Sequence, residues 1–307
     1  MLDEGPPRRD GDAADASGVG RLALPFAALV VLTWMLLVLG ALVRAHEAGL
    51  ACPDWPLCFG EFVPDMNLRV AFEWGHRVVA GGVSLIFATL AVLIWRRTEA
   101  GDPIRRLLVI AAGALAVQIL LGALTVWELL ASWTVTSHLL TGNAIAATFL
   151  WTALTLRDRR IAAPPPAPTT PRMRRWLAVT LALLFVQMLI GGLVSSRYAG
   201  LACPEWPTCN GGFWFPSWGG PVGLHLLHRM NGYLLLAAFV GLAAVCRDVG
   251  RLTTLTRVAV ALGLAQVVVG IANVLTGLPV EVTGLHSALA AALVLTGTAA
   301  AREAWGR

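Results

Sequence analysis

Four histidines, His76, His138, His228 and His286, lie inside long apolar stretches of this sequence. A polar ring in such a stretch is costly unless it has a partner, so these histidines are candidates for a functional site. A single histidine of this kind is more often a hydrogen-bonded packing residue. Two imidazoles at matched depth on two helices, however, can supply both axial ligands of one haem iron. The four histidines therefore predict two bis-histidine haem sites.

The histidines belong to an internal repeat. The segment GLACPDWPLCFG at residues 49–60 returns as GLACPEWPTCNG at residues 200–211. A His-Arg pair follows each copy, at residues 76–77 and 228–229, and each half then holds one more histidine in an apolar run. A structural zinc site usually gathers four ligands in one place. Each repeat offers only two, so iron in a porphyrin is preferred over zinc.

The two halves differ at one position beside these histidines. Glu73 stands three residues before His76, and the equivalent residue before His228 is His225. Residues three apart share one face of a helix, so each is expected to point towards the haem pocket of its half. A carboxylate in one half only suggests that this half transfers protons during chemistry and that the other transfers electrons. The alternative is that Glu73 caps the start of a helix, where acidic residues are favourable.

Arg77 and Arg229 follow the first histidine of each half. An arginine near a haem edge can pair with a propionate through charge-assisted hydrogen bonds. The paired occurrence favours this role, and the alternative is that both side chains extend to the membrane surface.

Each repeated segment carries a Cys-x5-Cys pair, Cys52 with Cys58 and Cys203 with Cys209. This spacing suits a small loop closed by a disulfide, which would order a lid above each site. A metal pair or a redox-active dithiol is the alternative, and for Cys52 and Cys58 a redox or substrate-contacting role stays open. The fifth cysteine, Cys246, is expected to be a free thiol.

The composition is that of a membrane protein. Hydrophobic residues make up 57% of the 307 residues and charged residues 13%, about half the charged fraction of a soluble domain. Apolar runs of bilayer-spanning length recur eight times. The predicted spans are Leu22–Val43, Val70–Trp95, Ile104–Trp127, Trp133–Leu156, Trp176–Ser195, Val222–Cys246, Leu255–Leu275 and Val282–Ala301.

The net charge of +5 does not indicate nucleic-acid binding, because its distribution follows the membrane topology. The chain has no lysine, and eighteen of its 23 arginines fall on one side of an eight-helix arrangement. Excess positive charge marks the cytoplasmic side. Both termini are therefore predicted in the cytoplasm, and both cysteine loops outside it, where disulfides persist.

The chain divides at a proline-rich stretch, IAAPPPAPTTP. The predicted organisation is a disordered cytoplasmic tail (1–21), an N-terminal four-helix half (22–156), an Arg/Pro-rich cytoplasmic linker (157–175) and a C-terminal four-helix half (176–303). Both halves start on the same side, so they form two pseudo-symmetric bundles that are parallel repeats, with a ligand site inside each.

A second signature repeats in the third, fifth and seventh predicted helices. Each contains Gln-x-x-x-Gly, whereas the first helix keeps only the glycine, Gly40. Small residues let helices approach closely, and a buried glutamine can hydrogen-bond across the interface, so helix packing is the favoured interpretation. The three pairs are Gln118/Gly122, Gln187/Gly191 and Gln266/Gly270.

Taken together, these motifs resemble the haem A synthase family: paired GLxCPxWPxC loops, Glu-x-x-His-Arg, a second His-Arg and two single histidines. The resemblance covers both halves. It implies an eight-helix membrane oxidoreductase that oxidises the C8 methyl of haem O to a formyl group, through the alcohol, giving haem A for terminal oxidases. By resemblance, His228 and His286 would bind a permanent haem b. His76 and His138 would face the substrate haem, with Glu73 as the catalytic carboxylate.

The predicted function is thus a multi-pass enzyme of the cell membrane with haem b as cofactor and haem O as substrate. A haem O synthase is a candidate supplier of that substrate, and the electron acceptor is not identified by the sequence. The alternative is a dihaem b-type transmembrane electron-transfer subunit, in which neither haem is modified. A haem or small-molecule transporter is a weaker third reading.

Overall fold

The structure is a computed structural model that describes residues 18–306, and this part of the chain is helical apart from its loops. Eight helices are each long and apolar enough to cross a membrane, which makes the chain a multi-pass membrane protein. Two isolated bridges, Cys58–Glu61 and Asn210–Phe213, are the only β pairing in residues 18–306. The helices are α2 (Ala23–Ala45), α3 (Leu68–Arg97), α4 (Pro103–Trp127), α5 (Ser132–Arg160), α6 (Pro171–Ser196), α7 (Gly220–Val245), α8 (Gly250–Leu275) and α9 (Val280–Trp305).

Local sequence signals determine where several of these helices begin. Asn67 caps α3, and its side chain accepts a hydrogen bond from the Val70 N–H at 3.1 Å. Thr170 caps α6 in the same way through the Met173 N–H, and Pro171 occupies the first helical position. Proline suits that position because its missing N–H would have no partner there. These caps let a helix extend beyond its apolar stretch.

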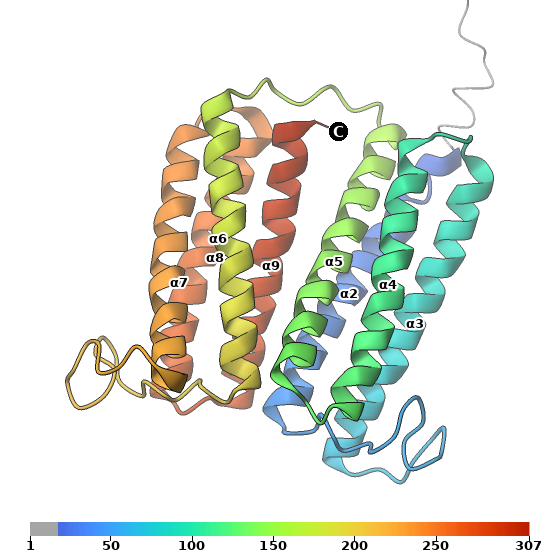
Figure 1. Cartoon of the computed structure of the whole chain (residues 1–307). Coiled ribbons are helices and arrows are strands. Elements are labelled where there is room, and N and C mark those ends of the chain that lie inside the picture. Colours follow the sequence, from blue (N-terminus) through green and yellow to red (C-terminus); the bar gives the residue numbers. More distant parts are fainter. Residues whose placement is uncertain (1–17, 307) are drawn as a thin grey trace, which may run out of the picture.

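The helices gather into two groups (Figure 1). In the first, α2 packs against α3 and α5, and α4 packs against α5; in the second, α6 packs against α7, and α8 against α9. Contacts of α2 with α9 and of α5 with α6 and α9 join the groups. Both cysteine loops lie at one end of the molecule, and the connector between α5 and α6 lies at the other, near the C-terminus.

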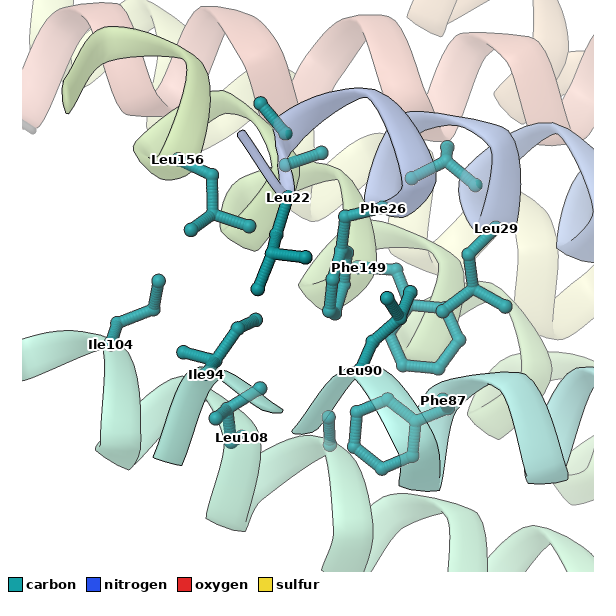
Figure 2. Packing of buried hydrophobic residues seen from close by; sticks show 14 of the residues in the cluster. Leu22, Phe26, Leu29, Phe87, Leu90, Ile94, Ile104, Leu108, Phe149 and Leu156 are labelled. Atoms are coloured by element: carbon teal, nitrogen blue, oxygen red, sulfur yellow. The ribbon is translucent and has the colours of Figure 1, made fainter. Parts of the chain in front are cut away.

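The largest apolar cluster fills the end of the first group that faces away from the cysteine loops (Figure 2). Phe149 of α5 contacts Phe26 of α2 edge-on, with ring centres 5.8 Å apart, and stacks on Phe87 of α3 at 4.9 Å. The cluster draws on the start of α2 and α4 and the end of α3 and α5. The predicted site residues of the same four helices lie nearer the end beside the loops; these are Glu73, His76, Arg77 and His138.

A buried ion pair joins the two groups at the end opposite the loops. Arg302 of α9 is 1% exposed, and its Nη1 lies 2.7 Å from Asp158 Oδ2 of α5. Nearer the middle, Trp34 Nε1 of α2 donates to the Ala288 carbonyl of α9 at 3.1 Å. The groups are therefore connected by polar bonds as well as by apolar contact.

The eight predicted spans are confirmed as helices, but α5 and α9 end four residues later than predicted, and α6 and α8 begin five residues earlier. The connector between α5 and α6 is limited to residues 161–170, shorter than the predicted linker 157–175, because the flanking arginines continue the helices. An apolar run reports the part of a helix that spans the membrane, whereas the helix continues at either end into polar surroundings.

The predicted polar tail is only partly described. Residues 1–17 lie outside the described part of the chain. Gly18–Gly20 form a helical turn rather than a disordered segment, and Val19 within it is buried.

Replacing Arg302 with methionine should destabilise the protein by about 1–3 kcal/mol, because the buried Arg302–Asp158 bond is lost while Asp158 stays buried with Arg157 as a remaining partner. Thermal unfolding in detergent would measure the loss. The matched control is Arg69→Met, since the Arg69–Glu47 pair is exposed, at 61% and 68% of the side chains, and should contribute at most about 1 kcal/mol. Equal effects of the two changes would contradict a structural role for the buried pair.

Candidate haem sites and cysteine loops

Each of the four histidines lies against a glycine of the helix that precedes its own. A Cβ atom added at those glycines would lie 3.0 to 3.3 Å from the Cε1 atom of the facing ring. A larger residue would therefore push the ring out of its place. The pairs are Gly40 with His76, Gly122 with His138, Gly191 with His228, and Gly270 with His286.

Three of the four rings also contact a glutamine amide of the neighbouring helix. The glutamines are those of the Gln-x-x-x-Gly signature, so helix packing describes only part of their role. Gln187 is itself held, because its Oε1 accepts a hydrogen bond from Asn231 Nδ2 at 2.8 Å. The contacts between Nε2 of the amide and a ring nitrogen are Gln118 with His138 (3.3 Å), Gln187 with His228 (3.2 Å) and Gln266 with His286 (3.2 Å).

The histidine pairs suit a shared iron atom. The ring centres of His228 and His286 are 6.4 Å apart. Two imidazoles on opposite sides of one metal ion place their ring centres roughly 6 Å apart, because each metal–nitrogen bond is about 2 Å long. His76 and His138 lie close enough to interact electrostatically. The Nδ1 atoms of His76, His138 and His286 are buried and have no hydrogen-bond partner among residues 18–306, so each half has a ring nitrogen that could bind iron.

Other arrangements of metal ligands are not found. Within residues 18–306, no three His, Cys, Asp or Glu side chains gather into a group that could hold a metal ion. A groove of about 310 Å³ between α2 and α9 is lined by apolar side chains, Trp34 and Thr296. It includes none of the predicted site residues.

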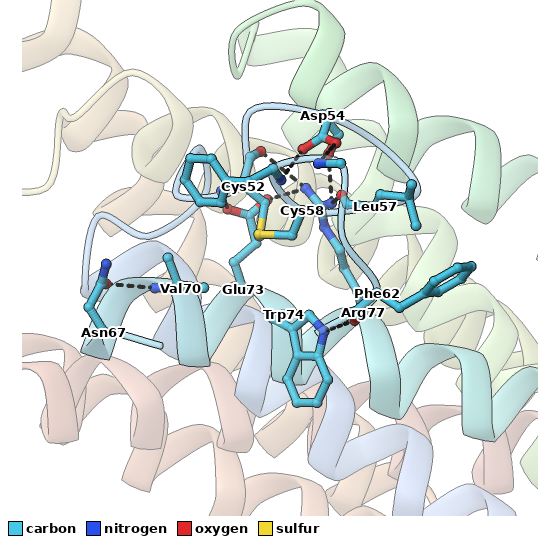
Figure 3. Close-up of a disulfide and its surroundings, with 12 residues drawn as sticks. Cys52, Asp54, Leu57, Cys58, Phe62, Asn67, Val70, Glu73, Trp74 and Arg77 are labelled. Carbon is cyan, nitrogen blue, oxygen red and sulfur yellow. Dashed lines mark hydrogen bonds and ion pairs between the residues drawn. A yellow bond between two sulfur atoms is a disulfide. The ribbon is translucent and has the colours of Figure 1, made fainter. Parts of the chain in front are cut away.

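Glu73 is buried on α3, and both of its carboxylate oxygens are in use (Figure 3). Oε2 accepts the backbone N–H of Cys52 at 2.8 Å, and Oε1 accepts Nη2 of Arg77 at 2.6 Å. The residue lies well inside the first turns of α3, which begins at Leu68 and is capped by Asn67. Helix capping, the alternative considered for Glu73, is therefore not its role. It holds the cysteine loop against the helix.

Arg77 holds the same loop by its carbonyl groups. Nη1 donates to the carbonyl oxygens of Asp54 and Leu57, at 2.7 and 2.6 Å, and Nη2 donates to that of Cys52 at 3.3 Å. The Cys52–Cys58 disulfide closes the loop. Glu73 and Arg77 together thus bind both the N–H and the C=O of Cys52.

The second half repeats this arrangement with a different acceptor. Arg229 donates to the carbonyls of Cys203 and Thr208, at 2.5 and 3.0 Å, and a disulfide joins Cys203 to Cys209. In place of the carboxylate, His225 faces the Cys203 N–H with Nδ1 and the Arg229 Nε with Nε2, both at 3.2 Å. A neutral imidazole has one acceptor nitrogen, so it can accept only one of these bonds, whereas the carboxylate accepts both.

An acidic residue organises each loop from inside. Asp54 accepts the N–H groups of Phe59 and Gly60, both at 2.7 Å. The Gly60 bond, together with the Phe59 bond, holds the pKa of the Asp54 carboxyl below its usual value. Glu205 has the same place in the second loop, where the Gly212 N–H, the Thr208 hydroxyl and the Gly211 N–H lower its carboxyl pKa. Each loop is therefore a preformed unit.

The structure brings together all the predicted site residues of each half. The residues that sequence reasoning did not assign to the sites are the four facing glycines and the three glutamines. Their signal was in the sequence, because Gln-x-x-x-Gly recurs at equivalent positions of three helices. Only the packing of neighbouring helices shows that these positions face the histidines.

Comparison with known proteins places the chain among relatives of one family. The family model described as cytochrome oxidase assembly protein, COX15-CtaA, matches residues 25–298. A protein of Halalkalibacterium halodurans named "Heme A synthase" is 31% identical over 67% of this chain and 70% of its own length. Proteins of the same name from Symbiobacterium thermophilum and Rhizorhabdus wittichii are 30% and 26% identical, over 74% and 78% of this chain and 77% and 83% of their own lengths.

Alkylation should show how the five cysteines are paired. Unfolded in SDS without reductant, each chain should take up one alkyl group, at Cys246, and after reduction it should take up five. In the folded protein Cys246 should react slowly, because burial raises the pKa of its thiol and the thiolate is the reactive form. Mass spectrometry would count the groups, and Cys246→Ser should remove the unreduced label. Three labels without reductant would contradict one of the disulfides.

Proposed function

Since this chain belongs to the COX15-CtaA family of cytochrome oxidase assembly proteins, we propose that it is a membrane oxidoreductase that converts haem O into haem A. The relatives named "Heme A synthase" match this chain over most of their own length. The observation that carries the proposal is the pair of duplicated histidine sites, of which only one has a buried carboxylate beside it. The substrate is haem O, and the C8 methyl group is the proposed site of oxidation.

We propose that the two helix groups are pseudo-symmetric parallel repeats, residues 22–156 and 176–303, joined by a short cytoplasmic connector. The repeated His-Gly contacts and the two clamped loops support this relation. The arginine distribution supports cytoplasmic termini and extracytoplasmic cysteine loops in the cell membrane.

The C-terminal half is the proposed site of a permanent haem b, held by His228 and His286. The ring separation of 6.4 Å and the glutamine at each ring support a rigid site. When bound, this haem supplies one-electron redox chemistry. The histidines hold and orient it, and the surrounding apolar helices exclude water.

The N-terminal half is the proposed substrate site, with His76 and His138 towards the haem iron and Glu73 as the catalytic carboxylate. Glu73 is 5% exposed, in a helix with little access to water. Its Oε1 and Oε2 accept one hydrogen bond each, from Arg77 and Cys52, and a proton taken up by the carboxylate weakens both bonds because they lose the negative charge of their acceptor. Proton transfer at Glu73 is therefore coupled to the loop that lies over the site.

Arg77 and Arg229 are the proposed partners of the haem propionates. A guanidinium group carries five N–H donors. Arg77 uses four of them, for three loop carbonyls and Glu73, and keeps its Nε–H for a propionate. Arg229 uses up to three and keeps at least two. Each arginine therefore has two proposed roles: it holds its loop, and it places a positive charge for a propionate next to a ligand histidine.

The rival function, a dihaem electron-transfer subunit, is not favoured by the relatives' names. It also gives no reason for a carboxylate in one clamp and an imidazole in the other, since two permanent haems would need similar surroundings. Delivery of haem O by a haem O synthase, and an electron acceptor that receives electrons from the C-terminal haem, complete the proposal. Membrane lipid surrounds the helices.

Removing a ligand of the C-terminal site should remove its haem. His228→Ala and His286→Ala should each abolish the low-spin haem b spectrum of the purified protein, because a bis-histidine site needs both imidazoles. His76→Ala, the matched change in the first half, should leave that spectrum in place. An unchanged bis-histidine spectrum in both C-terminal variants would contradict the assignment.

The substitution Glu73→Gln tests whether the carboxylate of Glu73 takes part in the oxidation of haem O. The amide still offers an oxygen to the Cys52 N–H but cannot take a proton or carry charge. Haem A production should therefore fall on the order of 10²–10⁴-fold while haem b content is kept. Extraction and chromatography of the bound haems measure this, with haem O or its alcohol expected to accumulate.

The matched control is His225→Gln at the equivalent position of the other half, which should lower haem A production far less. A Glu73→Gln protein that makes haem A at the wild-type rate would rule out the catalytic role. A wild-type protein that yields haem b alone when supplied with haem O would rule out the proposed function.

A further inference from the structure

The four candidate ligand histidines do not have equal surroundings. His138, His228 and His286 each face a glutamine amide from the neighbouring helix, at 3.2 to 3.3 Å. That glutamine always stands four residues before the glycine on which the ring lies. In α2 the glycine is Gly40, and the residue four positions before it is Leu36. The fourth histidine, His76, therefore faces the same kind of glycine without the amide.

In the described part of the chain, no other polar group takes the place of the missing amide. The ring of His76 makes no hydrogen bond within residues 18–306, and its Nδ1 is buried without a partner. The nearby carboxylate of Glu73 is occupied by Cys52 and Arg77. Leu36 packs into the apolar cluster of the first group. The imidazole of His76 is thus positioned by packing alone.

Hydrogen bonds around a metal ligand matter for how firmly the metal is held. A partner that orients the ring reduces the freedom lost on binding and adjusts ligand basicity, and its removal costs typically about 10–100-fold in metal affinity. An iron-bound imidazole carries a hydrogen on its other ring nitrogen, and that hydrogen needs an acceptor. The Oε1 atoms of Gln118 and Gln266 are buried without a partner within residues 18–306, so a half-turn of either amide would bring an acceptor to that hydrogen. In the C-terminal half both ligand histidines face a glutamine amide. In the N-terminal half only His138 has one.

We infer that Gln118, Gln187 and Gln266 are positioning residues for their histidines, and that Leu36 makes His76 the readily released iron ligand of the N-terminal site. This inference rests on the proposed function. A substrate haem must enter and leave at every turnover, whereas a cofactor haem must stay. The one histidine without an amide lies in the half where exchange is required.

Supplying the missing amide should slow haem exchange. The full-length protein would be loaded with haem b and haem O, and excess apomyoglobin would capture whatever is released. Leu36→Gln should lower the rate of haem O release about 10–100-fold. Leu36→Met, similar in volume and without a donor, should release haem O at the wild-type rate. Extraction of the captured pigment identifies which haem left.

Removing a glutamine amide in the C-terminal half tests whether the amide slows haem release. This second test is independent of whether Leu36→Gln folds. Gln266→Leu should raise the rate of haem b release about 10–100-fold, with the absorption spectrum reporting loss of the low-spin form. Wild-type release rates in whichever of these variants fold would overturn the inference. The proposed function fails separately, if the wild-type protein makes no haem A from haem O.

Discussion

A histidine inside a membrane helix has no water to satisfy its ring nitrogens, so the protein must provide every partner. This constraint shapes both halves of the molecule. The glycine opposite each ring lets the imidazole lie close to a neighbouring backbone. Within residues 18–306, glutamines on three helices then supply the only hydrogen-bonding contacts that three of the rings make. The remaining unpartnered nitrogens are suited to an iron atom.

The same constraint explains how the helices divide their length. One end of the first group is filled by a cluster of aromatic and aliphatic side chains, including Phe26, Phe87 and Phe149. The other end carries histidines, small residues and the clamped loop. Dense packing at one end makes this group rigid, and the candidate ligand histidines His76 and His138 lie on two of its helices.

Each disulfide loop is held by a side chain that lies close to a candidate haem site. Glu73 is both the candidate proton carrier and the acceptor that holds the Cys52 N–H, so its protonation weakens the attachment of its own loop. His225 has the equivalent place in the second half, where the ring can accept only one of the two bonds offered to it. A buried carboxylate that bonds both the loop and the neighbouring arginine therefore occurs only in the half proposed to carry out the reaction. In the second half an imidazole occupies that place.

The amino-acid sequence by itself determined the class of protein, the eight spans, the duplicated halves and the histidines, because hydropathy and spacing are properties of neighbouring residues. It also predicted the cysteine pairs, six positions apart. Only the tertiary structure decided that Glu73 turns its oxygens towards Cys52, that the three glutamines face histidines, and that Arg302 meets Asp158, 144 residues away. Which way a helix turns its polar face depends on the helices packed around it, and local sequence does not contain that information.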